Sequence, residues 1–142
     1  MQFDRNGLEI ICRAECLRLL AGARIGRVGL SVGALPTVLP VNFAVVDDAI
    51  VLRTAPGSKL DAALANAVVA FEVDSFDPLY HTGWSVLVQG VAYEATPREV
   101  EHLRIEPWAP GEKSHWVRIV PASITGRRIA LPELQRESKG SL

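Results

Sequence analysis

The segment from Trp84 to Ala95 alternates between two faces with a period of two, which is the side-chain periodicity of a β-strand. One face carries Ser85, Leu87, Gln89, Val91 and Tyr93, and the other carries Trp84, Val86, Val88, Ala92 and Glu94. The segment is longer than most strands. A bulge at Gly90 would bend it, so that one strand could serve two parts of a barrel.

The remaining segments predict an antiparallel sheet with a few short helices. Helices are expected at 9–21, 59–66 and 96–104, and strands at 26–30, 37–46, 49–54, 68–73 and 116–120, with an extended piece at 124–129 after a break at Pro121. Asp47-Asp48 predicts a hairpin turn, and residues 74–83 predict a loop. Because strands and helices do not alternate, a small antiparallel barrel of about six strands is favoured over a doubly wound sheet.

Length and composition are those of one ordinary globular domain. The chain has 142 residues, of which 49% are hydrophobic and 22% are charged. We therefore expect a single domain over 1–142, with flexible tails at 1–8 and 136–142.

The charge and the hydropathy of the sequence indicate which kinds of partner to expect. Fifteen basic and sixteen acidic residues give a net charge of −1, so neither nucleic acid nor an anionic membrane is expected as a partner. No apolar run is long enough for a membrane span, and the first residues lack the apolar core of a signal peptide. These features favour a cytoplasmic protein with a small-molecule ligand.

A candidate anion site lies where a predicted strand meets a predicted helix. Arg53 and Thr54 end the strand, a Pro-Gly turn follows, and Ser58 and Asp61 have the spacing of a capping box. The helix would begin at Lys59 and direct its free N–H groups toward the turn, where a phosphate could bind between two full charges. A solvated strand-turn-helix connection without a ligand fits the same local pattern.

Other chemistries have less support from the sequence. Cys12 and Cys16 lie on one helical face and are interpreted as buried thiols, because the three histidines show no ligand spacing with them; no metal site is expected. There is no G-x-S-x-G elbow for a hydrolase and no G-x-G-x-x-G motif for a dinucleotide fold. From local context alone, Asn42 is interpreted as a hydrogen-bonded polar residue of the core, and Trp84 and Ser85 as residues that only pack against their neighbours.

The order of several short motifs resembles the pyridoxamine phosphate oxidase-like family, and most of all its small bacterial flavin-nucleotide-binding branch. The motifs are Gly26-Arg27-Val28-Gly29, Leu39-Pro40-Val41-Asn42-Phe43, Leu52-Arg53-Thr54 with Gly57-Ser58-Lys59-Leu60, Gly83-Trp84-Ser85-Val86 with Gly90, Trp116-Val117-Arg118-Ile119 and Thr125-Gly126-Arg127-Arg128. The similarity runs from about residue 9 to residue 129.

This resemblance implies a six-stranded split β-barrel that forms a homodimer, with two flavin mononucleotide (FMN) sites at the subunit interface. Family positions that hold the phosphate match Arg53, Thr54, Ser58 and Lys59 here. Those along the isoalloxazine ring match Pro40, Val41, Asn42 and Phe43, and those that reach the flavin from the other subunit match Trp84 and Ser85. The cofactor would supply the redox chemistry.

The chain departs from the true oxidases at two places. The closing segment 121–128 lacks their Arg- and His-bearing pattern, and Trp84-Ser85 stands where they carry an Arg-Gln pair. We therefore expect an FMN-dependent oxidoreductase that transfers hydride to a small acceptor, with no catalytic acid or base assigned. The alternatives are a deazaflavin-dependent reductase and a non-enzymatic protein that binds or stores flavin or haem.

Overall fold

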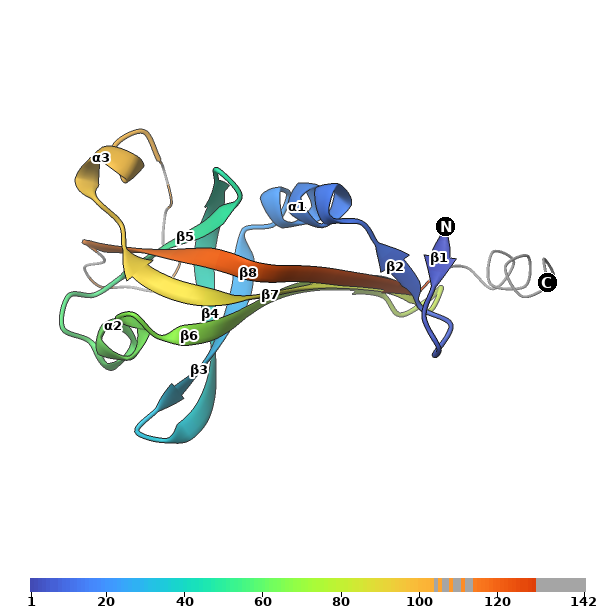
Figure 1. Ribbon diagram of the computed structural model, residues 1–142, viewed down its shortest axis with the longest axis horizontal. Helices are drawn as coiled ribbons and strands as arrows, with labels where there is room; N and C mark the ends of the chain where they lie inside the picture. Colours follow the sequence, from blue (N-terminus) through green and yellow to red (C-terminus); the bar gives the residue numbers. More distant parts are fainter. Residues whose placement is uncertain (104, 106–107, 109–110, 112–113, 130–142) are drawn as a thin grey trace.

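Six antiparallel strands form a closed ring in the order β8-β5-β4-β3-β6-β7, and β7 pairs back onto β8 (Figure 1). This computed structural model describes residues 1–103, 105, 108, 111 and 114–129. Two short strands, β1 and β2, continue the sheet outward from β8. The small antiparallel barrel predicted from the alternating segments is therefore confirmed.

The elements follow one another along the chain with short connections. Their bounds are β1 Gln2–Phe3, β2 Glu9–Ile11, α1 Arg13–Ala21, β3 Ile25–Val32, β4 Leu35–Val46, β5 Ala49–Thr54, α2 Lys59–Leu64, β6 Val68–Asp77, β7 Thr82–Glu94, α3 Pro97–Val100 and β8 His115–Ile129.

The barrel has two distinguishable ends. At one end, here called the α2 end, β5 leads toward α2, and Thr54 pairs with His115 at the start of β8. At the other end, here called the hairpin end, a four-residue turn at 78–81 joins β6 to β7, and β2 pairs with the end of β8. Figure 1 shows α2 and α3 at one end of the molecule and the N-terminus at the other.

Apolar side chains from the ring and from α1 fill the interior. Phe71 and Phe43 pack edge to face with their ring centroids 4.8 Å apart. Helix α1 covers the barrel with Cys16 and Leu20, both fully buried. This packing fixes the inward faces of β3, β4 and β6.

Strand β8 continues through Pro121, so the predicted break there is wrong. The pairing of β7 with β8 shifts register between Gln89 and Gly90, and Ala122 is the extra residue on β8. Pro121 lies opposite Gly90 at this bulge, a position at which a strand tolerates the missing N–H group. The irregularity predicted at Gly90 is confirmed. A Cβ atom there would lie 2.0 Å from the Val120 carbonyl oxygen, so the close approach requires glycine.

The β6–β7 hairpin is longer than the sequence indicates. Residues 74–83 were expected to form a loop, but β6 extends to Asp77, which pairs with Thr82. Continuous pairing along β7 supplies the partners that the local sequence could not reveal. The other expected hairpin is confirmed, because Asp47 and Asp48 both adopt positive φ, at 49° and 63°, as a type I′ turn requires.

The N-terminal residues take part in the sheet. Gln2 and Phe3 pair with Ile10 and Glu9, within the segment expected as a flexible tail, whereas 136–142 lie outside the described residues. Helix α1 begins at Arg13 rather than at residue 9, because residues 9–11 pair with β8 instead. Within the described ranges, no helix is long and apolar enough to cross a membrane.

Candidate functional site

A hollow of about 280 Å³ at the α2 end brings together six of the ten predicted site residues. Strand β4 supplies one wall, and the end of β5 with the following turn supplies the other. The six are Pro40, Val41, Asn42, Arg53, Thr54 and Ser58, and Leu39, Ala55, Leu60 and Ile105 complete the lining.

The turn between β5 and α2 is held by the Asp61 side chain. The Ser58 hydroxyl accepts from the Asp61 backbone N–H at 3.1 Å, which confirms Ser58 as the N-cap. The Asp61 carboxylate accepts from the Thr54 hydroxyl at 2.8 Å and from the Gly57 N–H at 3.0 Å. The donors of Thr54 and Gly57 are thus directed to Asp61 rather than into the hollow.

Arg53 is fixed beside the hollow by two neighbours. Its Nη1 donates to the Ile105 carbonyl at 3.0 Å, and its guanidinium lies 5.0 Å from the centre of the Trp116 ring. A cation held against an aromatic face is oriented as well as attracted. Lys59, the other predicted cation, is exposed and does not line this hollow.

Asn42 has a local explanation as a polar residue in an apolar strand. Its side-chain amide donates to the Arg24 carbonyl at 3.2 Å, and its side-chain oxygen accepts from the backbone N–H of Trp108 at 2.8 Å. It therefore joins three separate segments beside the hollow. Phe43 is 5% exposed and packs in the core, so only its backbone can serve a ligand there.

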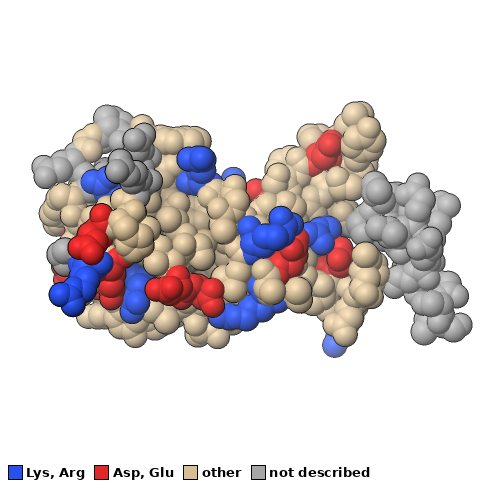
Figure 2. Space-filling model, turned by 90° about the horizontal axis from the view of Figure 1, so that it is seen from above, with Lys and Arg blue, Asp and Glu red and all other residues tan. Residues whose placement is uncertain are grey.

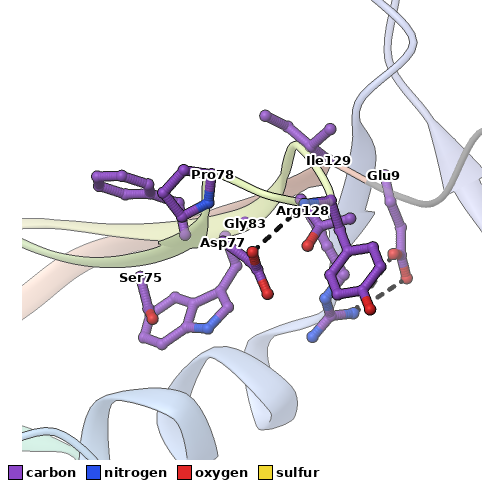
Figure 3. A pocket seen from close by; sticks show the side chains of 11 residues that line it. Glu9, Ser75, Asp77, Pro78, Gly83, Arg128 and Ile129 are labelled. Atoms are coloured by element: carbon purple, nitrogen blue, oxygen red, sulfur yellow. Dashed lines mark hydrogen bonds and ion pairs between the residues drawn. The ribbon is translucent and has the colours of Figure 1, made fainter.

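Trp84 and Ser85 do not line this hollow within one chain. Trp84 lines a larger hollow of about 790 Å³ at the hairpin end, together with Phe76, Pro78, Tyr80 and Ile129. Figure 3 looks into this hollow, where Arg128 reaches across to Glu9. Ser85 follows on β7 and pairs with Asp74 and Arg127.

His115 completes the α2 end, and the sequence analysis did not assign it. Its Nδ1 contacts the Asp61 carboxylate, and its Nε2 lies 2.9 Å from the Glu94 carboxylate. The hydrogen bond to Asp61, followed by that to Glu94, raises the pKa of His115. The register of β5 against β8 could not be seen in the sequence, and it is this register that brings His115 opposite Thr54.

Two opposing effects act on the Asp61 carboxyl. Burial raises its pKa, but hydrogen bonds from His115, Thr54 and Gly57 outweigh this, and the net effect lowers the pKa. Asp61 is therefore ionised at neutral pH, and a protonated His115 forms a charged pair with it.

Charged side chains of both signs lie on the surface of the barrel (Figure 2). On the face seen in Figure 2, basic and acidic side chains lie beside one another. The described residues include no group of three or more His, Cys, Asp or Glu side chains that could hold a metal ion. Cys16 is buried as expected, but Cys12 is exposed, because it precedes α1 on the solvent side.

Comparisons with known proteins agree with this architecture. The uncharacterized protein Rv0080 of Mycobacterium tuberculosis is 40% identical in an alignment 125 positions long, which covers 82% of each chain. The FAD binding protein of Mycobacterium smegmatis superposes with a TM-score of 0.76 at 37% identity, over 86% of this chain and all of that one. An FAD-binding protein of Mesorhizobium loti, at 22% identity and a TM-score of 0.68, shares the fold over 87% of this chain and 99% of that one.

The family can be stated from the extent of the match. The sequence profile described as pyridoxamine 5'-phosphate oxidase matches residues 12–128, which include the ring of strands except for its last residue. The resemblance drawn from the ordered motifs is thereby confirmed, and the chain belongs to the pyridoxamine 5'-phosphate oxidase family.

Proposed function

We propose that the chain is a flavin-binding oxidoreductase that uses FMN and transfers hydride between a reduced donor and a small acceptor in the cytoplasm. One observation carries this proposal. The fold gathers six predicted residues from two segments, 40–42 and 53–58, around one hollow: Pro40, Val41, Asn42, Arg53, Thr54 and Ser58. Family membership and 37% identity to an FAD binding protein of M. smegmatis give independent support.

The donor set of the hollow suits a flavin phosphate. Arg53 would supply the full charge, and Ser58 would donate its hydroxyl proton, because the oxygen of that hydroxyl already accepts from Asp61. Thr54 would act through Asp61, to which its proton is directed. Lys59, next to Ser58 on α2, would add charge from the rim.

The ring would lie along β4. The extended backbone at 39–42 offers alternating carbonyl and N–H groups, apart from Pro40, which has no N–H. Val41 and Leu39 would cover the faces of the ring, and Asn42 would keep the strand in place through its two hydrogen bonds. When bound, a flavin supplies the hydride chemistry, and the protein places it and excludes water.

We further propose that two copies form the site together. The hollow of one chain lies at the lower limit of the roughly 300 to 1,000 Å³ that small-molecule pockets occupy, so a second surface is needed to enclose a flavin. Trp84 and Ser85 lie outside that hollow and would approach it from the neighbouring subunit of a homodimer.

Substitution of Arg53 tests the phosphate site. A charge-assisted hydrogen bond contributes about 1.5 to 3 kcal/mol, so Arg53→Ala should weaken FMN binding at least tenfold and leave riboflavin binding nearly unchanged. Fluorescence titration of both ligands measures this, with Arg98→Ala on the exposed face of α3 as the matched control. Equal losses for both ligands would show that Arg53 acts through the fold.

Visible spectra of the purified protein test the redox assignment. Flavin bands that bleach with a reduced nicotinamide support the oxidoreductase, and a flavin that no donor reduces supports storage instead. Titration with FAD beside FMN decides between the two nucleotides. A Soret band would identify haem as the ligand and would contradict the proposal.

Mixed dimers test the shared site. A heterodimer of one Arg53→Ala chain and one Trp84→Ala chain would carry both lesions in one site and leave the other site intact. Mixing the two defective homodimers should therefore restore flavin binding to about half of the sites, given the symmetry of a two-fold dimer. If exchange is confirmed by mass and binding is not restored, Trp84 does not serve the partner's site.

A further inference from the structure

The turn of the proposed phosphate site depends on the partly buried carboxylate of Asp61, which does not line the hollow. Both oxygens of Asp61 are occupied: Oδ1 accepts from Thr54 at 2.8 Å and contacts His115, and Oδ2 accepts from Gly57 at 3.0 Å. Asp61 does not line the hollow, whereas Thr54 and Ser58 do. One side chain thus determines where the turn lies relative to Arg53.

His115 holds this carboxylate from the opposite side. It lies at the start of β8, where β8 pairs with Thr54 of β5, and the following residue, Trp116, packs against Arg53. The first two residues of β8 therefore support both the turn and the cation of the proposed site. The Asp61 and His115 side chains are only 14% and 29% exposed, so water screens their contact less than that of a surface pair.

The charged groups that face His115 in the described structure are both acidic. Asp61 comes from α2, and Glu94 comes from the end of β7, while β5 contributes the uncharged Thr54 opposite His115. A proton on His115 offsets these two negative charges. Without that proton, a carboxylate beside the turn would be uncompensated, and a phosphate dianion in the hollow would be repelled by it.

We propose that Asp61 and His115 are positioning residues for the flavin phosphate, and that loss of the His115 proton weakens phosphate-dependent binding. This inference rests on the proposed phosphate site and adds a control of that site by pH. The raised pKa of His115 means that its stabilising contribution is complete below about pH 6.5, the unperturbed value, and disappears as pH rises through the folded-state pKa. The lowered pKa of Asp61 has the opposite sense, so its contribution is lost only in acid.

The first measurement needs no flavin. NMR titration of the His115 ring in the free protein should give a pKa above the ordinary histidine value, and Asp61→Asn should lower it. The ring of His102, exposed in the turn after α3, serves as the internal reference signal. An unshifted His115, or one that does not respond to Asp61→Asn, would overturn the proposal.

The second measurement compares the dissociation constants of FMN and riboflavin from pH 7 upward. In this range the phosphate stays dianionic, and titration of the isoalloxazine ring cancels because both ligands share it. The preference for FMN should fall by about tenfold as His115 loses its proton, which corresponds to one charge-assisted hydrogen bond. In His115→Gln the preference should not depend on pH. In Asp61→Asn, which removes the repelling carboxylate, the fall should be smaller than in the natural chain. His102→Gln should behave as the natural chain.

Linkage provides a separate check, because coupling between two binding events is reciprocal. FMN should raise the pKa of His115 further, whereas riboflavin should not. A preference for FMN that is independent of pH would overturn this inference and leave the phosphate site standing. No preference for FMN at any pH would overturn both the phosphate site and the inference built on it.

Discussion

The two ends of the barrel differ in what they bury and expose. The α2 end buries a polar network, whereas the hairpin end exposes large apolar side chains. At the α2 end, Thr54 is 1% exposed, and Asp61 takes up its hydroxyl, so a polar network closes on itself inside one chain. At the hairpin end, Phe76, Leu79 and Tyr80 are 73%, 79% and 64% exposed. An exposed apolar surface of this size is typical of a contact with another protein.

This difference separates two kinds of requirement. At the α2 end, the described polar side chains of the turn hydrogen-bond to one another, so substitutions there should affect folding and ligand binding. The hairpin end exposes large apolar side chains, and their substitution should affect association between subunits. Stability and oligomeric state should therefore respond to different residues.

The largest expected effect is on the association of the proposed homodimer, through the exposed apolar side chains of the hairpin end. Replacing Phe76, Leu79 and Tyr80 together by Ser should raise the dimer dissociation constant at least 1,000-fold, because three apolar side chains contribute about 4 kcal/mol when buried. Sedimentation measures the association, and the melting temperature of the monomer should hardly change.

The control for this variant uses the other exposed hairpin. Leu35 and Val38 are 70% and 67% exposed near the β3–β4 turn, and replacing both by Ser should leave the dimer intact. If this control dissociates while the triple variant does not, the contact between subunits lies at the β3–β4 turn and not at the hairpin end.

A smaller effect is expected on folding at the α2 end. Asp61→Ala leaves the buried Thr54 hydroxyl and the Gly57 N–H without their acceptor, which should lower the free energy of unfolding by about 2 to 3 kcal/mol. Denaturant titration measures the loss, and Glu101→Ala, exposed after α3, is the matched control. Equal stability of the two variants would show that water replaces Asp61 in the turn.

The smallest effect is expected for an ion pair at the hairpin end. Arg128 donates to Glu9 at 3.3 Å and also to Glu15 at 3.3 Å, so Glu9→Gln leaves it one acidic partner. The unfolding free energy should fall by less than about 1 kcal/mol, and added salt should reduce the difference further. A larger loss would mean that this end also contains a closed polar network.

Features that depend on neighbouring residues could be predicted from the sequence. Ser58 caps α2, Asp47-Asp48 forms a tight hairpin, and Gly90 lies at a bulge, because each of these follows from spacing or from backbone sterics. The barrel was predicted because several segments have the period-two pattern of strands and because strands do not alternate with helices. The family was predicted from the order of the motifs.

Features that depend on pairing between distant strands could not be predicted. Pro121 is tolerated because it faces the bulge, and β6 reaches Asp77 because β7 pairs with its whole length. In the same way, the spacing of Ser58 and Asp61 identified a cap but not the Asp61 contact with His115, which joins residues 54 positions apart. Six of the ten predicted site residues line one hollow, and Lys59, Phe43, Trp84 and Ser85 lie outside it.

Strand β8 has a consequence for synthesis on the ribosome. It pairs with β2, β5 and β7, and it is made last among the described strands. Until it emerges, β5 and β7 are two open edges of a five-stranded sheet, and such edges can pair with other chains. We expect a nascent chain that stops before His115 to require a chaperone, and the barrel to close only after translation of the last strand.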